Sequence, residues 1–371
     1  MRRLLIAIVI LVLLGASAFL AEQFVFFVPG PEAAHGRATV VWIKPGESSA
    51  GIARDLQHAG VVRNATLFRL SVRLRGQLAA LKAGEYVFPS GASMAAVMGI
   101  LIEGKSIQHR ITAAEGLTSQ MIYDIVVKNS VLSGPAGAVP AEGSMLPETY
   151  LFTRGTTRAQ VLARMARAQQ RLIAKLWPAH APDLPFKSPE EAITLASIVE
   201  KETALPQERR HIAAVFINRL KQGTKLQSDP TVIYGITKGY PLGRGIRESE
   251  LAAATPYNTY VIAGLPPTPI CNPGKDSIAA VLQPQASNDL YFVANGTGGH
   301  VFTSSLAEHE KNVARWRQIE ETQKPPALPN APTPPAPNGP LRGTADTQSP
   351  TSAAVAAPAA AVHHRHRRHR S

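Results

Sequence analysis

Residues 188–203 read SPEEAITLASIVEKET, and this stretch predicts a helix with a well-defined start. Ser188 can be the N-cap, and Pro189 suits the first helical position. Glu191 completes a Ser-x-x-Glu capping box. Two turns of small and apolar residues follow and end in a carboxylic acid, Glu200. We therefore expect a capped helix that carries an acid near its C-terminal end.

The surroundings of Glu200 suggest a chemical role. At about 100° per residue, it shares a helix face with Ile193, Ala196 and Ser197, whereas Glu202 points roughly the other way. Lost hydration on such a face raises the pKa of a carboxyl group, and a neutral carboxylic acid can protonate a leaving group. The alternative is an ordinary solvated Glu-Lys-Glu cluster at a helix end. The helix alone leaves both interpretations open.

Composition narrows the class of protein. The chain has 371 residues, enough for two modest domains, and its net charge of +13 favours anionic surroundings. No nucleic-acid-binding motif accompanies the charge, so we expect no nucleic-acid partner. The single cysteine, Cys271, excludes an internal disulfide and a cysteine-based metal cluster. The sequence has no HExxH or GxSxG pattern, and we expect neither a metal nor a cofactor.

The N-terminus predicts the compartment. Arg2 and Arg3 precede an uncharged run over residues 4–21, which is long enough to cross a bilayer as a helix. The basic pair places the N-terminus in the cytoplasm and the rest of the chain in the periplasm, on a single-pass inner-membrane anchor. The alternative is a cleaved signal peptide, because residues 16–18 (ASA) resemble a cleavage site. The length of the run favours the anchor.

Capping and turn residues along the chain predict an α+β fold. We expect three strand–turn–helix units before residue 129, long helices at 156–177 and 207–221, and strands at 290–294 and 300–302. The predicted parts are a cytoplasmic stub and transmembrane anchor (1–28), a linker (29–37), small strand–helix modules (38–105), a connecting α+β subdomain (106–155), a candidate catalytic domain that carries Glu200 (156–321) and a disordered Pro/Ala-rich tail with a His/Arg end (322–371).

Several loops after the helix are rich in neutral hydrogen-bonding side chains. Such groups suit a site for an uncharged, polar, ringed ligand such as a sugar chain. Taken singly, each is more often a turn or capping residue. The residues in question are Gln227, Ser228, Tyr257, Asn258, Thr259, Tyr260 and Asn272.

A set of motifs in fixed order carries a resemblance to a known family. They are LASIVEKET (195–203), VFINRL (215–220), LQSDPTV (226–232), YNTY (257–260), GLPP (264–267), NPG (272–274) and EH (308–309). Over about residues 38–320 the chain resembles the endolytic murein transglycosylases of bacterial envelopes, and residues 38–105 resemble the LysM-like units of that family. It departs from the family pattern at Leu117, at residues 144–146 and at Thr268.

The resemblance implies a reaction. Glu200 would be the only catalytic acid, cleaving the β-1,4 bond between N-acetylmuramic acid and N-acetylglucosamine in peptidoglycan strands and leaving 1,6-anhydro-muramoyl ends. It also implies substrate contacts from the loop residues above and from Asp229, with Glu142 and Glu148 lining the cleft. A role in ending nascent strands implies membrane-bound wall synthases as partners. Two alternatives stay open: a hydrolytic muramidase, and a non-enzymatic peptidoglycan-binding scaffold.

Overall fold

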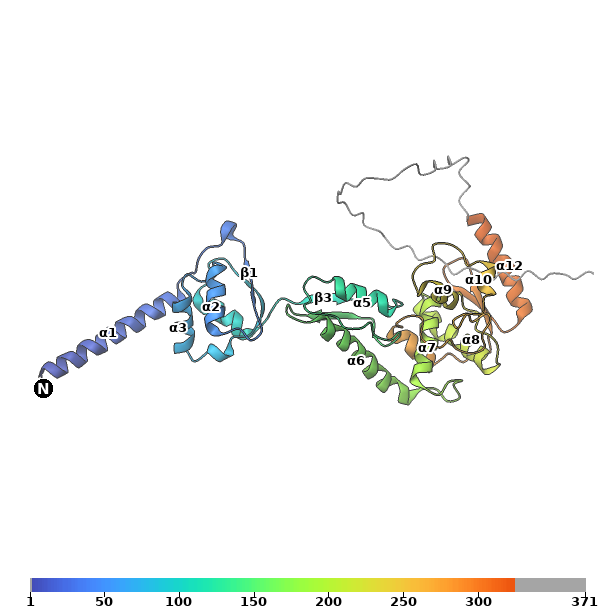
Figure 1. The fold of residues 1–371 in the computed structure, drawn as a ribbon, viewed down its shortest axis with the longest axis horizontal. Coiled ribbons are helices and arrows are strands. Elements are labelled where there is room, and N and C mark those ends of the chain that lie inside the picture. Colours follow the sequence, from blue (N-terminus) through green and yellow to red (C-terminus); the bar gives the residue numbers. More distant parts are fainter. Residues whose placement is uncertain (1, 324–371) are drawn as a thin grey trace, which may run out of the picture. The chain divides into compact units, whose positions relative to one another are not determined.

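The computed structural model describes residues 2–323 (Figure 1). These residues divide into two compact units, which are described separately. Unit 1 holds residues 2–114, 120–140 and 147–167, and unit 2 holds residues 115–119, 141–146 and 168–323.

Unit 1 begins with α1 (Arg2–Phe27), which is long and apolar enough to cross a membrane. Its side chains over residues 2–21 are all exposed, so none of the other described elements covers the apolar run. Only its last turns touch the following module, where Phe26 is buried. Length and composition fit a membrane anchor and equally a signal sequence, so the predicted orientation stays a prediction.

A small α+β module follows α1. Its elements are β1 (Thr39–Ile43), α2 (Ser49–His58), α3 (Ala65–Leu74), the 3-10 turn η2 (Leu78–Ala80), β2 (Gly84–Phe88) and α4 (Met94–Glu103), after a first 3-10 turn, η1 (Ala34–Gly36). Side chains of Ser48, Asn64 and Ser93 cap the three helices, and the caps at Ser48 and Ser93 are predicted by the sequence. However, β1 and β2 pair antiparallel, so the first two predicted strand–helix units form one module with one core.

The rest of unit 1 is built on a second antiparallel pair, β3 (His109–Thr112) with β4 (Thr149–Phe152). The pair accompanies α5 (Ser119–Lys128) and the first part of α6 (Arg158–Leu176). Glu85 of β2 is buried and accepts hydrogen bonds from Arg154 Nε, at 2.7 Å, and from the ring of His109, at 2.6 Å. This carboxylate therefore joins the β1–β2 module to the β3–β4 pair.

Unit 2 is mainly helical around the predicted helix. Here α7 (Pro189–Glu202) packs against α8 (Arg209–Lys221), α9 (Asp229–Thr237) and α11 (Lys275–Leu282), and their apolar side chains form one core. The other elements are two 3-10 turns, η3 (Trp177–Ala179) and η4 (Pro206–Glu208), the short α10 (Glu248–Leu251), the antiparallel pair β5 (Tyr291–Ala294) and β6 (His300–Thr303), and α12 (Leu306–Gln323).

The mixed α+β prediction is confirmed, including the apolar N-terminal helix. The strand β4 and the short helix α10 were not predicted. The LysM-like identity of residues 38–105 and the domain boundaries stay predictions. From residue 324 on, the predicted tail with its His/Arg end lies outside the described residues.

Candidate functional site

The helix predicted from residues 188–203 forms as α7, with its capping box in place. Ser188 Oγ accepts from the Glu191 backbone N–H at 3.2 Å, and Glu191 Oε2 accepts from the Ser188 N–H at 3.2 Å. Residues 194–199 are all buried, which fixes the helix in the core of unit 2. Glu200 follows on the last turn, and only 6% of its side chain is exposed.

Two groups hold the Glu200 carboxylate. The backbone N–H of Gly274 donates to Oε2 at 2.9 Å, and Arg209 Nη2 lies 3.9 Å from Oε1. The same Nη2 lies 3.6 Å from Glu115 Oε2, while Arg209 Nη1 lies 3.8 Å from Asp276 Oδ2. These separations exceed a hydrogen bond, so Arg209 lies among three carboxylates without closing on any of them.

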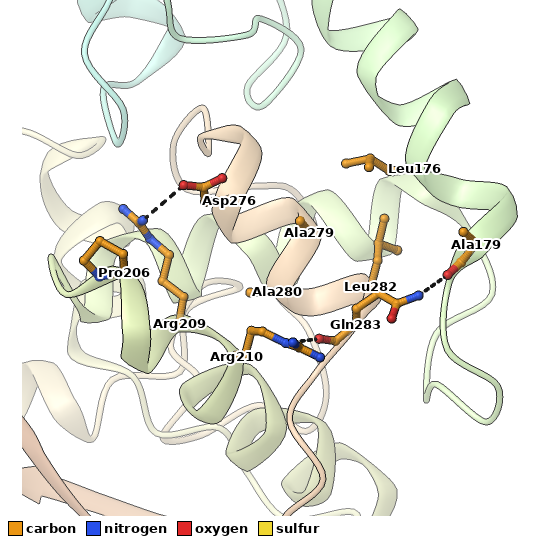
Figure 2. Close-up of a pocket in the computed structure, with 10 residues that line it drawn as sticks. All are labelled: Leu176, Ala179, Pro206, Arg209, Arg210, Asp276, Ala279, Ala280, Leu282 and Gln283. Atoms are coloured by element: carbon orange, nitrogen blue, oxygen red, sulfur yellow. Dashed lines mark hydrogen bonds and ion pairs between the residues drawn. The ribbon is translucent and has the colours of Figure 1, made fainter.

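A cavity of about 440 Å³ adjoins this group (Figure 2). Leu176, Ala279, Ala280 and Leu282 give it an apolar lining, and Arg209 and Arg210 add positive charge. Arg209 is 8% exposed, and its Nε has no hydrogen-bond partner among the described residues. The cavity therefore reaches the guanidinium that stands beside Glu200.

The second acid of α7 is enclosed as well. Glu202 Oε1 accepts from Ser228 Oγ at 2.5 Å. Burial raises the pKa of Glu202 to about 7, and the nearby Asp229 adds to the rise, against the effects of Ser228 and Arg219. Helical periodicity predicted that Glu200 is buried and that Glu202 points away from it. The prediction that only Glu200 is buried is wrong, because the loop at Ser228 folds back over the face of α7 that carries Glu202.

We expect the Glu202 carboxyl to make stability depend on pH. The pKa of Glu202 in the folded protein is above the ordinary 4.5. The contribution of its protonated form to folding stability is therefore complete below pH 4.5 and is lost as the pH rises through about 7. The unfolding free energy of the wild type, relative to Glu202→Gln, should fall between pH 5 and pH 8 by up to about 3 kcal/mol. Urea unfolding at four pH values measures this, with the exposed Glu190→Gln as control. A difference that stays constant over the range contradicts the assignment.

The loop at residues 225–228 is held by Arg219. Its Nη1 donates to the carbonyl of Leu226 at 2.9 Å and to Gln227 Oε1 at 3.2 Å, and its Nε donates to the carbonyl of Leu290 at 2.6 Å. Gln227 has φ = +54°, which a non-glycine residue adopts only where its surroundings enforce it. The backbone N–H of Gln227 donates to the carbonyl of Thr259 at 3.1 Å. Arg219 and Thr259 thus fix a strained segment 25 to 28 residues beyond Glu200 in sequence.

Four of the predicted sugar-binding residues are enclosed: Ser228 is 2% exposed, and Asn258, Thr259 and Asn272 are 0% exposed. Thr259 Oγ1 accepts from the Ser228 N–H at 2.9 Å. Asn258 Nδ2 donates to three carbonyls between residues 250 and 253. Asn272 Nδ2 reaches Leu117 O, Ser119 Oγ and Glu142 Oε1, and its Oδ1 accepts from the Met145 N–H. These side chains hydrogen-bond within and between the loops, and their contact with a sugar chain stays a prediction.

The other predicted residues are distributed differently. The Tyr257 ring packs against the Tyr234 ring in a tilted arrangement, with centroids 4.9 Å apart, and Tyr260 OH donates to Asp229 Oδ1 at 2.5 Å. Asp229 is the first residue of α9, its carboxylate accepts this hydrogen bond, and burial raises its pKa. Its contact with substrate stays a prediction. Glu142 accepts from the Ser119 N–H at 2.7 Å, and burial raises its pKa also.

Glu148 lies in unit 1, whereas Glu200 and the other predicted site residues lie in unit 2. Its side chain is exposed, and its backbone carbonyl accepts from the Ala113 N–H at 3.1 Å. A cleft role for Glu148 stays a prediction. Within residues 2–323, no three His, Cys, Asp or Glu side chains are grouped to hold a metal ion.

Sequence analysis missed Arg209, Arg219 and Glu115. The two arginines belong to α8, where charged residues between apolar ones are typical of a solvated helix face. Yet both are 8% exposed. Glu115 approaches Arg209 from 94 residues earlier in the chain. Only tertiary packing brings these groups together, so no local pattern marks them.

Comparison with known proteins gives consistent matches. The sequence profile of the YceG-like family matches residues 41–315. An endolytic murein transglycosylase of Bacillus subtilis is 29% identical over 72% of this chain and 82% of its own length. One of Streptococcus pneumoniae is 27% identical over 83% of this chain, which spans 64% of that relative. A crystal structure of a putative YceG-like protein from Listeria monocytogenes, 28% identical, covers 74% of this chain and 98% of its own with a TM-score of 0.46.

Proposed function

Because this chain belongs to the YceG-like family and is a peptidoglycan transglycosylase, we propose that it cuts glycan strands internally with Glu200 as its catalytic residue. The bond is the β-1,4 linkage between N-acetylmuramic acid and N-acetylglucosamine. The product carries a 1,6-anhydro-muramoyl end. The observation that supports this most is the Glu200 carboxylate, which is held on a rigid helix, is almost enclosed, and lies 3.9 Å from the Arg209 guanidinium that lines a cavity.

Glu200 acts twice in the proposed reaction. As an acid it gives its proton to the glycosidic oxygen while positive charge develops at C1 of the muramic acid. As a carboxylate it then takes the proton of the muramic acid C6 hydroxyl, whose oxygen bonds to C1. The proton lost in the first step is regained in the second, and no water is consumed. The Gly274 N–H holds the carboxylate in place by a hydrogen bond, and Arg209 adds positive charge 3.9 Å away.

One observation favours hydrolysis as a second candidate. Glu115 and Glu200 share Arg209 Nη2, so two carboxylates stand near one another, as they do in most glycosidases. In that case Glu115 would activate water or stabilise the cation. The transglycosylase reaction is preferred, because the chain is 29% identical to a protein of that name.

We also propose that the enzyme is anchored in the inner membrane and acts in the periplasm. With α1 across the inner membrane and Arg2 and Arg3 in the cytoplasm, units 1 and 2 lie in the periplasm, where peptidoglycan is found. An enzyme that ends nascent strands there would work near the membrane-bound synthases that make them. The LysM-like module would add contacts to glycan.

The product decides between the candidates. We expect polymeric peptidoglycan treated with the full-length protein to yield fragments that end in anhydro-muramic acid, 18 Da lighter than the hydrolytic product because no water is added. Mass spectrometry of fragments, before and after borohydride reduction, reads this directly, since anhydro ends resist reduction. Reducing ends in place of anhydro ends would establish the muramidase. Binding to sacculi without new ends would leave only a scaffold.

A further inference from the structure

One face of α3 exposes apolar side chains that no described residue covers. Leu67 is 43% exposed, Leu70 45% and Leu74 61%. The spacings of three and four residues put these leucines on one side of the helix. The core of the module is packed instead by Phe68 and Val72, on a different side. Helix α3 is therefore anchored by one face and leaves a second apolar face bare.

The C-terminal end of α3 is fastened to the end of α1. Arg75 Nη1 donates to Glu22 Oε1 at 2.7 Å, and Nη2 donates to Gln23 Oε1 at 3.0 Å. The guanidinium also lies 3.6 Å from the ring centroid of Phe26. In the view of Figure 1, α3 runs across the end of α1 and not along it. The two helices thus meet at a fixed point, one turn or less after the apolar run of α1.

That meeting point corresponds to the edge of a bilayer. Glu22 is the first charged residue after the apolar run, so it marks where hydrocarbon gives way to headgroups. Phe24 and Phe27, at the same level, are 72% and 63% exposed, and aromatic rings are typical of this zone. A helix fastened to Glu22 and crossing α1 would lie along the membrane surface.

The charges of α3 complement such a surface. Arg69 and Arg73 on the helix, and Arg63 just before it, are exposed, and no acidic residue occurs between residues 60 and 80. Each helical arginine directly precedes an exposed leucine, about 100° away around the axis. Leucines on one side with arginines flanking them are the pattern of a helix that lies in a bilayer interface.

We propose that α3 is an interfacial helix, with Leu67, Leu70 and Leu74 in the outer hydrocarbon and its arginines on lipid phosphates. The inference rests on the proposed anchoring by α1 but not on the reaction. It makes the β1–β2 module a part of the membrane surface, held there by both α1 and α3. The occupant of the leucine face is thus lipid, and not a second protein.

Site-directed fluorescence on the full chain tests this. Single cysteines at Leu70→Cys, at Leu13→Cys in α1 and at Val40→Cys in β1 would carry an environment-sensitive dye, in nanodiscs that contain one-third phosphatidylglycerol. Val40 is a matched control, because it is 54% exposed and β1 lies on the side of the module away from α1 (Figure 1). Cys271 is fully buried, so the unsubstituted protein should take up no dye.

We expect iodide in the water to quench the dye at position 70 at least about threefold less than the dye at position 40. A spin label at a shallow position in the lipid chains should quench position 70 and not position 40. The double substitution Arg69→Gln and Arg73→Gln should raise iodide quenching at position 70 toward the level at position 40. Nanodiscs without anionic lipid should have the same effect.

Three results would overturn the proposal. Equal iodide quenching at positions 70 and 40 would mean that the leucine face is in water. Protection of position 70 from both quenchers would mean that protein covers it. Exposure of position 13 to iodide would remove the anchor and the interfacial helix together. None of these outcomes bears on glycan cleavage, so failure here is distinct from failure of the proposed reaction.

Discussion

Glu200→Gln is expected to lower the rate of glycan cleavage by about a thousandfold or more, since one group serves as both acid and base. Glutamine has nearly the same shape, and its side-chain oxygen can still accept from the Gly274 N–H. It cannot give or regain a proton at the pH of the reaction. The variant should therefore fold and bind glycan while cleaving it hardly at all.

The measurement is the appearance of anhydro-ended fragments from polymeric peptidoglycan, quantified by chromatography and mass spectrometry. Glu190→Gln is the matched control, because Glu190 is exposed in the first turn of the same helix. Thermal unfolding of both variants checks the fold. If Glu200→Gln keeps a tenth of the wild-type rate, the catalytic assignment is wrong.

Glu115→Gln adds a second arm to this experiment. A hydrolase that needs two carboxylates should lose most of its activity with either substitution. A transglycosylase with Glu200 alone should lose far less with Glu115→Gln, because Glu115 would only share the charge of Arg209. Comparable losses at both positions would favour the muramidase.

Arg219→Met is expected to destabilise unit 2 by about 3–5 kcal/mol. The side chain is 8% exposed and donates to the carbonyls of Lys225, Leu226 and Leu290 and to Gln227. Methionine fills much of the same volume but donates nothing, so these buried acceptors lose their partner. The strained Gln227 would lose one of its two supports.

Urea unfolding followed by tryptophan fluorescence measures the change. A Trp42→Phe background restricts the signal to Trp177 and Trp316, which lie in the same unit as Arg219. Arg171→Met on α6 is the control, since that arginine is exposed. A loss below about 1 kcal/mol, the size expected at the surface, would show that water replaces the lost donors.

Local signals predicted the helices well. The capping box at Ser188 and the caps at Ser48 and Ser93 depend on residues three positions apart, and all three form as expected. Strand pairing was another matter. The paired residues of β1 and β2 lie more than forty residues apart, and the sequence of one strand does not identify its partner. The single module was therefore predicted as two separate units.

The site was predicted in its residue types more than in its geometry. Neutral hydrogen bonders do gather after α7, but Asn258 and Asn272 point inward to backbone groups, and residue type does not distinguish such a support from a ligand contact. Helical periodicity placed Glu202 away from Glu200. It could not anticipate that a loop 26 residues later would cover Glu202 too.

The Gly274 N–H that reaches Glu200 belongs to the N-cap of α11. Aligned peptide dipoles give this end of a helix a partial positive charge, which is fixed in place before any reaction begins. In the proposed mechanism the carboxylate carries a negative charge between its two proton transfers. During that interval it would face an electrostatic environment that needs no rearrangement, because the backbone of α11 supplies it. Helix α11 would then act as a permanent counter-charge for a transient anion.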